Sequence, residues 1–198
     1  RVLFRSTQAI AIDPTSSGNY NNLGSCLFNL NRFKDAITCY QTSLELEPKN
    51  FIALSNYANS LDKIFEYEKS IEIYKECLLN TELTDQQIYE IKYKMSLPLL
   101  ASGRLIEGWE NFEYGLLYKD RQSRKPQRQF NIPKWTGEAI PDKTLLVWRE
   151  QGLGDELTYL TLVPQLFEYC KDIIIECDTR LISLLQRSFP ACRDRKSV

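Results

Sequence analysis

Apolar residues in the first part of the chain recur every three or four positions, the spacing of helices that bury one face. The pattern then repeats as a whole. Residues 17–50 align without a gap on residues 51–84, at an offset of 34, and Leu27 falls on Leu61. Pro48 cannot continue a helix and marks the passage from the first copy to the second. The pattern therefore predicts two successive pairs of helices.

Small residues occupy fixed places in both copies and indicate how each pair packs. Gly24 aligns with Ala58 in the first predicted helix, and Ala36 aligns with Ser70 in the second. Small side chains let two antiparallel helices approach closely, while large residues such as Tyr40 fill the spaces between them. A single pair leaves one face uncovered, so the pairs are expected to stack on one another.

Two further copies are weaker. Residues 85–118 form a third copy at an offset of 38, with a first helix expected at 86–101 and Gly108 in the place of Ala36. Residues 7–16 match the end of a still earlier copy. We therefore predict one helical array over residues 7–118.

The spacing of these positions resembles the tetratricopeptide (TPR) pattern, which is aromatic-x2-Leu-Gly-x2-Leu, then Ala-x3-aromatic, then Pro. The residues that carry the pattern in the first copy are Tyr20, Leu23, Gly24, Leu27, Ala36, Tyr40 and Pro48. The resemblance implies an α-helical TPR solenoid that holds a protein or peptide partner. It also implies that the first helix of each pair lines the concave face.

Polar residues recur on these first helices and are the candidate peptide-binding residues. They pair at the 34-residue offset as Asn22 with Asn56, Ser25 with Asn59, and Asn29 with Lys63. Stacked asparagines offer a donor and an acceptor to an extended peptide backbone, and the solenoids of some protein-modifying glycosyltransferases carry such ladders. The alternative is that the asparagines join neighbouring helices. A site that clamps the carboxyl-terminal carboxylate of a peptide is disfavoured. Such a site needs several lysine or arginine residues on this face, and the pattern offers only Lys63.

The sequence changes character after Tyr118. Residues 119–141 are polar, basic and rich in proline, which predicts a linker. Residues 142–193 then read as strand, glycine turn, helix, strand and helix. The predicted elements are strands at 143–149 and 173–177 and helices at 156–169 and 180–187. This β-α-β-α order predicts the start of a parallel α/β sheet.

The segment Pro133–Asp155 carries a second resemblance. Its Pro-x-Trp-x-Gly and Trp-x-Glu-Gln-Gly-x-Gly-Asp motifs resemble bacterial TPR proteins with a glycosyltransferase-like C-terminal domain of the two-Rossmann (GT-B) type, related to heptosyltransferases. The resemblance implies a Rossmann-like domain that takes sugar from a nucleotide-sugar donor. Asp155 would be the general base. The residues implied to line the substrate site are Glu150, Gln151, Gly152 and Gly154.

Other interpretations of this turn stay open. Asp155 lies where a helix N-cap belongs, and capping alone explains an aspartate there. A dinucleotide fingerprint is disfavoured, because Leu157 stands where its third glycine should be. The donor of GT-B enzymes binds mainly in a second Rossmann half, so we expect no cofactor in residues 142–193 themselves. The alternative function is a non-catalytic interaction scaffold with a degenerate GT-B-like domain.

Composition narrows the remaining classes. No apolar run approaches the roughly 18 residues of a membrane span, and no signal peptide is visible, so we expect a cytoplasmic protein without a membrane span. The chain has six cysteines but no histidine. Because no two cysteines form a C-x-x-C pair, a metal site of the common zinc type is not expected.

The two ends have a different origin from the rest, on our interpretation. Residues 1–6 and 194–198, translated back into DNA, share a core in reverse complement that resembles a sequencing adapter. We therefore expect the natural segment to cover about residues 7–193 of a longer protein. Omitting the ends removes four basic residues and one acidic residue, which moves the formal net charge from −1 to −4. A negative charge argues against nucleic acid as the main partner.

Overall fold

The computed structural model describes residues 2–118, 130–150 and 152–194. The chain divides into unit 1, Arg1–Ser123, and unit 2, Arg124–Val198. Each unit has a hydrophobic core of its own. Residues 119–129 of the predicted linker lie outside the described residues.

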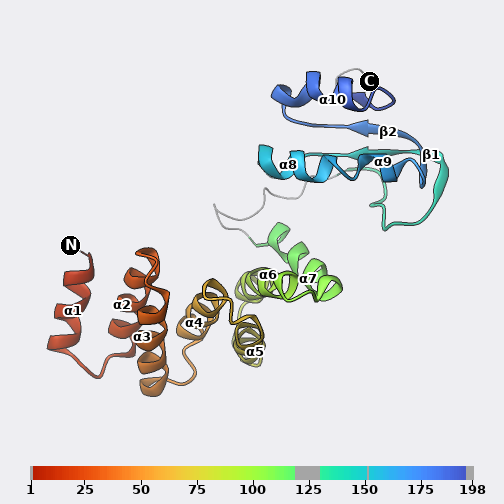
Figure 1. The fold of residues 1–198 in the computed structure, drawn as a ribbon. Coiled ribbons are helices and arrows are strands. Elements are labelled where there is room, and N and C mark those ends of the chain that lie inside the picture. The colour runs from red at the N-terminus through yellow and green to blue at the C-terminus, as the bar shows by residue number, and fades with distance from the viewer. Residues whose placement is uncertain (1, 119–129, 151, 195–198) are drawn as a thin grey trace. The chain divides into compact units, whose positions relative to one another are not determined.

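Unit 1 is an array of helices in which each helix packs on the next (Figure 1). We number the helix pairs repeat 1 (α2 and α3), repeat 2 (α4 and α5) and repeat 3 (α6 and α7). The first helices of neighbouring repeats also touch one another, α2 with α4 and α4 with α6. The predicted helical solenoid is therefore confirmed. Its elements are α1 (Val2–Ile12), α2 (Ser17–Asn29), α3 (Phe33–Leu46), α4 (Phe51–Lys63), α5 (Tyr67–Leu78), α6 (Asp85–Ala101), α7 (Leu105–Phe112) and the 3-10 helix η1 (Glu113–Leu116).

The structure extends two of the predicted elements. α1 begins at Val2, before the predicted start of the array at residue 7, and Leu3 packs against the core around Tyr40. α6 begins at Asp85 because Thr84 caps it, with its hydroxyl accepting from the Gln87 N–H.

Small residues create the close contacts inside the repeats, as the sequence predicts. A Cβ placed on Gly24 would lie 2.6 Å from the ring of Tyr40, and one on Gly108 would lie 2.6 Å from a methyl carbon of Leu100. Ser70 is fully buried and its hydroxyl donates to the Ala58 carbonyl across the helix pair at 2.8 Å. Glycine or serine at these places thus lets the two helices of a repeat come together.

The turn between the two helices has the same backbone shape in each repeat. Asn31, Phe65 and Gly103 occupy equivalent positions and have φ angles of 59°, 66° and 85°. Glycine and asparagine adopt this left-handed conformation readily, whereas an aromatic residue is strained by about 1–2 kcal/mol. In repeat 2, Phe65 therefore adopts a turn conformation that its own preference opposes.

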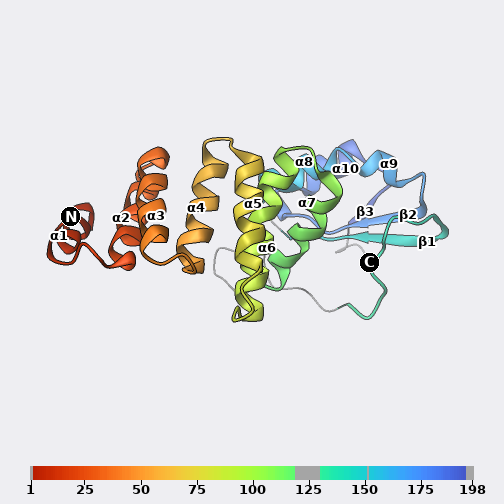
Figure 2. The same ribbon diagram turned by 90° about the horizontal axis from the view of Figure 1, so that it is seen from below.

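Unit 2 is a parallel α/β arrangement, which confirms the predicted sheet type. Its strands lie in the order β1-β2-β3, and the two longer ones pair Leu145 with Ile173 and Val147 with Ile175. Helices α8, α9 and α10 lie on one side of the sheet (Figure 2). The elements are β1 (Ile140–Val147), α8 (Leu153–Leu160), α9 (Val163–Leu166), β2 (Cys170–Ile175), η2 (Thr179–Leu181), α10 (Ile182–Ser188) and β3 (Arg193–Asp194).

Alternate strand residues build the core of unit 2. Leu145, Ile173 and Ile175 are buried together with Val163 and Leu185 from the helices. Because side chains alternate between the faces of a sheet, Leu146 and Ile174 point to the opposite face. Two paired parallel strands and the two-residue β3 are as far as the described part of unit 2 goes toward the predicted Rossmann-like domain, and that assignment stays a prediction.

Several boundaries in unit 2 differ from the predicted ones. Both strands begin and end before the predicted positions, since apolar residues alone do not show where pairing stops. The single helix predicted at 156–169 is wrong, because α8 ends at Leu160 and α9 follows from Val163. Pro164 lacks the backbone N–H that a continuous helix would donate to the Leu160 carbonyl, and its ring crowds that carbonyl, which explains the break. The helix predicted at 180–187 starts as a short 3-10 turn.

Candidate functional site: the inner face of the array and the carboxyl end of the sheet

The first helices of the repeats, α2, α4 and α6, form a continuous layer. We call the surface of this layer that is turned away from the second helices the inner face. All the predicted peptide-binding residues lie on α2 and α4. Asn22 and Asn29 are exposed on α2, while Asn59 on α4 is partly buried.

Asn56 joins α4 to α2. Its Nδ2 donates to the Oδ1 of Asn21 at 3.0 Å, across the seam between repeats 1 and 2. The sequence alignment pairs Asn56 with Asn22 instead. Asn22 and Asn56 hold the same position in their repeats. The stacking of α4 on α2 nevertheless brings Asn21, the residue before Asn22, opposite Asn56. The alternative interpretation, in which the asparagines join neighbouring helices, thus holds for one of the two Nδ2 hydrogens of Asn56. Asn21 is a residue that the sequence analysis missed.

Ser25 and Lys63 also have partners inside unit 1. The Ser25 hydroxyl donates to the Asn21 carbonyl at 3.0 Å and lies 3.4 Å from the Tyr40 hydroxyl. Lys63 is exposed and pairs with Asp62 at 3.2 Å. A ligand that uses either residue would therefore compete with an existing contact.

The third repeat contributes different chemistry to the inner face. At the offset of 38, Lys94 takes the place of Asn56, and Leu97 takes that of Asn59. Lys94 pairs with Glu90 one helical turn away. Leu97 is 46% exposed. The sequence analysis missed both residues, although the offset it had found locates them.

Charge is distributed unevenly over the array. α2 contains no charged residue, and the only charges on α4 are Asp62 and Lys63, which neutralise each other. The second helices carry more, including Glu68, Lys69 and Glu72 on α5. The first helices of repeats 1 and 2 therefore carry no net charge, and they are rich in asparagine.

The glycine turn lies at the carboxyl end of β1, the end where open parallel sheets bind ligands. Gly152 precedes α8 as its N-cap, and its N–H donates to the Asp155 Oδ2 at 3.2 Å. The predicted N-cap position of Asp155 is therefore wrong by three residues, since α8 begins earlier and the glycine turn is shorter than the pattern suggested. Asp155 and Gly154 are exposed and Glu150 is partly buried, while Gln151 lies outside the described residues.

An ionic network that the sequence analysis missed crosses the same end of the sheet. Arg149, just beyond β1, contacts Asp178 at 3.1 Å and Glu156 at 3.5 Å. The Asp178 N–H donates to the Glu156 Oε2 at 2.8 Å, and Arg180 pairs with Asp178 at 2.9 Å. The network ties the end of β1, the first turn of α8 and the segment after β2 together.

The network affects the protonation of one member. Hydrogen bonds from the side chain and backbone of Arg180, aided by Arg149, hold the pKa of Asp178 well below its usual range. Asp178 is therefore a carboxylate at neutral pH.

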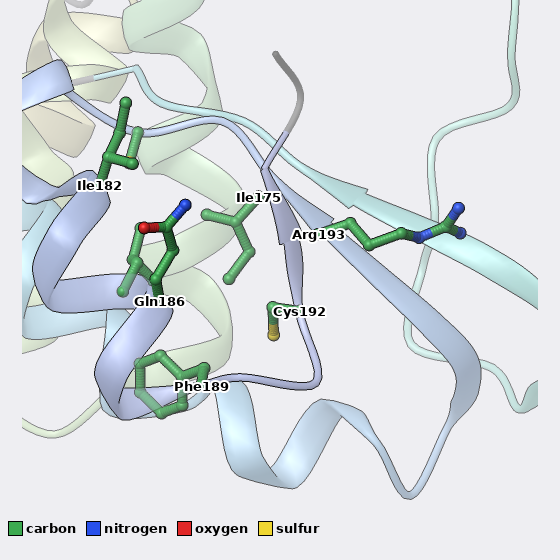
Figure 3. Close-up of a pocket in the computed structure, with 8 residues that line it drawn as sticks. Ile175, Ile182, Gln186, Phe189, Cys192 and Arg193 are labelled. Carbon is green, nitrogen blue, oxygen red and sulfur yellow. The ribbon is translucent and has the colours of Figure 1, made fainter. Parts of the chain in front are cut away.

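Other candidate sites contribute little. A small apolar hollow lies between β2 and α10, and Figure 3 shows Ile175, Phe189 and Cys192 around it. Burial raises the pKa of the Cys192 thiol, which disfavours the reactive thiolate.

Within the described residues, no group of three or more Cys, Asp or Glu side chains is placed to hold a metal ion. No helix of the described part has the length and apolar character needed to cross a membrane.

Comparison with known proteins agrees with the fold of unit 1. Residues 20–50 match the tetratricopeptide repeat family. The chain is 27% identical to protein FlbA of Caulobacter vibrioides over 185 residues. The aligned region covers 92% of this chain and 30% of FlbA. The chain thus spans about 30% of the length of this relative.

Solved structures with the same fold are similar to the helical part. MamA has a TM-score of 0.50 at 20% identity, covering 59% of this chain and 62% of its own. YrrB, described as a TPR protein with an unusual peptide-binding site, has a TM-score of 0.50 at 16% identity and covers 58% of this chain and 57% of its own. Unit 1 is therefore a TPR fold.

Proposed function

We propose that unit 1 binds an extended segment of a partner protein along the inner face of repeats 1 and 2. The observation that carries the proposal is that α2 has no charged residue and the two charges of α4 pair with each other, while Asn22 and Asn29 are exposed and Asn59 is partly exposed on these helices. Amide side chains both donate and accept, so they suit the alternating N–H and C=O groups of an extended backbone. The peptide-binding site named for YrrB, a protein of the same fold, supports the same use.

The test is a selection of random peptides of about 12 residues, displayed on phage, against the whole chain. We expect enriched peptides whose affinity falls about fivefold in Asn22→Ala and again in Asn29→Ala, since each loses one hydrogen bond. Methylation of backbone nitrogens in the peptide should weaken binding similarly. Asn111→Ala, a change on the second helix of repeat 3, is the matched control and should leave affinity unchanged. Failure to enrich any peptide, or equal loss in the control, would reject the proposal.

We propose as a second function that unit 2 begins a GT-B-like domain for sugar transfer, in a cytoplasmic protein. The supporting observation is the turn from Gly152 to Asp155 at the carboxyl end of a parallel strand. In this proposal Glu150, Gln151, Gly152 and Gly154 line the site. The nucleotide-sugar donor would be the substrate that brings the sugar.

Asp155 would take the proton of the acceptor hydroxyl through the oxygen that does not bind Gly152. The competing role is the one its other oxygen already performs, which is to accept the Gly152 N–H and stabilise the start of α8. In that case the domain serves as a non-catalytic scaffold.

Hydrolysis of nucleotide sugars by the protein expressed from its complete reading frame separates the two roles. We expect Asp155→Asn to lower the rate about a hundredfold or more, because general-base catalysis contributes that much. Asp172→Asn, a change on β2, is the control. Equal rates for the wild type and Asp155→Asn would eliminate the base role, and the absence of hydrolysis in the wild type would favour the scaffold.

A further inference from the structure

We propose that Asn21 and Asn56 act as one unit, a backbone clamp at the seam between α2 and α4, in which Asn21 both orients Asn56 and binds the ligand. This inference rests on the proposed peptide-binding function of the inner face. It adds a residue and a specific hydrogen-bonding role. The starting point is the bond from the Asn56 Nδ2 to the Asn21 Oδ1 at 3.0 Å.

The bond fixes which atom of each amide faces which way. A free asparagine can rotate its amide and present either a donor or an acceptor. Once the Asn56 Nδ2 donates to Asn21, the Oδ1 of Asn56 points away from the bond as an acceptor. By the same geometry, the Nδ2 of Asn21 remains as a donor.

Both remaining atoms retain access to a ligand. Asn21 and Asn56 are only partly buried. Among the described residues, the buried side-chain polar atoms that make no hydrogen bond are the Ser55 Oγ and the Glu156 Oε1, and neither clamp atom is one of them. Asn21 also lies on a helix that contains no charged residue.

One donor and one acceptor side by side match the backbone of an extended chain. The N–H and C=O of one residue in a strand point to the same side and are offered together to a neighbour. The clamp would accept the N–H at Asn56 and donate to the C=O at Asn21. It would therefore recognise main chain irrespective of the side chain at that position.

The clamp occurs at one seam only in the described array. The residues equivalent to Asn21 and Asn56 one repeat later are Ser55 and Lys94. The Ser55 side chain is buried, and Lys94 pairs with Glu90. Backbone recognition should thus centre on repeats 1 and 2, whereas repeat 3 offers charge and the exposed Leu97 to a ligand side chain.

Asn21→Asp tests the ligand role separately from the structural one. The new carboxylate still accepts from Asn56 but has no N–H to donate. With a peptide selected on the wild-type chain as the probe, we expect affinity to fall about fivefold to tenfold while the melting temperature is unchanged. Asn21→Ala should lower both. The measurements are made in about 0.5 M salt, which screens the added negative charge. Asn111→Asp controls for any effect of the charge that the salt does not screen.

The outcomes separate the inference from the function on which it rests. Failure to select any peptide rejects peptide binding itself. If peptides bind and respond to Asn22→Ala and Asn29→Ala but bind Asn21→Asp as tightly as the wild type, the clamp alone is rejected. An affinity loss in Asn21→Asp that merely follows a drop in melting temperature, or that Asn111→Asp reproduces, rejects it as well.

Discussion

Replacing Tyr74 by alanine should destabilise unit 1 by about 3–5 kcal/mol, the usual cost of removing a buried aromatic side chain. Tyr74 is 1% exposed on α5. It lies in the core that joins repeats 2 and 3, together with Leu54, Ala58, Ile71, Cys77, Ile91, Met95 and Leu99. The loss is a large part of the stability of a typical domain, so the melting temperature should fall by more than about 10 °C.

The location of Tyr74 also predicts how unfolding changes. In a stacked array, each repeat is stabilised by its interfaces with the adjacent repeats. A cavity at the interface of repeats 2 and 3 should therefore weaken their coupling and broaden the transition. Urea unfolding followed by far-ultraviolet circular dichroism measures both the midpoint and the steepness.

Two variants control for this result. Tyr74→Phe keeps the ring and should cost less than about 1.5 kcal/mol. Tyr67→Ala removes an aromatic side chain from the same helix at a partly buried position, so its effect should be much smaller. If Tyr74→Ala unfolds at the same urea concentration as the wild type, the stacking of these repeats is not what stabilises unit 1.

Replacing Glu156 by alanine should destabilise unit 2 by about 2 kcal/mol. The Glu156 side chain is 8% exposed and accepts the Asp178 N–H at 2.8 Å. Its removal leaves that N–H without its acceptor and takes one of two carboxylates from Arg149. Because Arg149 is 28% exposed, water compensates for part of the loss.

The fluorescence of Trp135 and Trp148 reports on unit 2 separately. Trp135 packs against the core of the sheet, and Trp148 follows β1. Trp109 belongs to unit 1, so the measurement is best made in a Trp109→Phe background. The expected result is a lower urea midpoint for these two tryptophans without a change in the circular dichroism transition of unit 1.

Glu156→Gln and Glu168→Ala are the matched variants. The glutamine keeps an oxygen for the Asp178 N–H and loses only the charge, so it should fall between wild type and alanine. Glu168 is exposed in the same unit, and its replacement should have little effect. Equal midpoints for all four proteins would mean that the network does not stabilise the carboxyl end of the sheet.

The two units differ in how far the sequence predicts them. The repeat of unit 1 is visible because each helix pair needs small residues at fixed places, such as Gly24 beside Tyr40, and large ones between them. Unit 2 has no such repetition. Its parallel strands follow from apolar runs separated by a helical pattern, but its helix boundaries depend on Pro164 and on pairing between strands.

The candidate sites show more clearly which contacts the sequence could not predict. The sequence places Asn56 on the inner face, yet its hydrogen-bond partner is Asn21 and not the equivalent Asn22. One residue along a helix turns the side chain by about 100°, so a small offset between stacked helices decides which asparagine is opposite. In the same way, the role of Asp155 at the start of α8 depends on where the glycine turn ends.

By itself, the sequence determined the helical repeat, the small residues that let helices pair, and the parallel order of strand and helix. These features follow from local spacing, because helix and strand periods and close packing constrain nearby residues. The tertiary structure alone decided the clamp of Asn21 and Asn56 and the network of Arg149, Glu156 and Asp178. Both join residues from different elements, and their contacts depend on the relative rotation and translation of those elements, which local spacing does not encode.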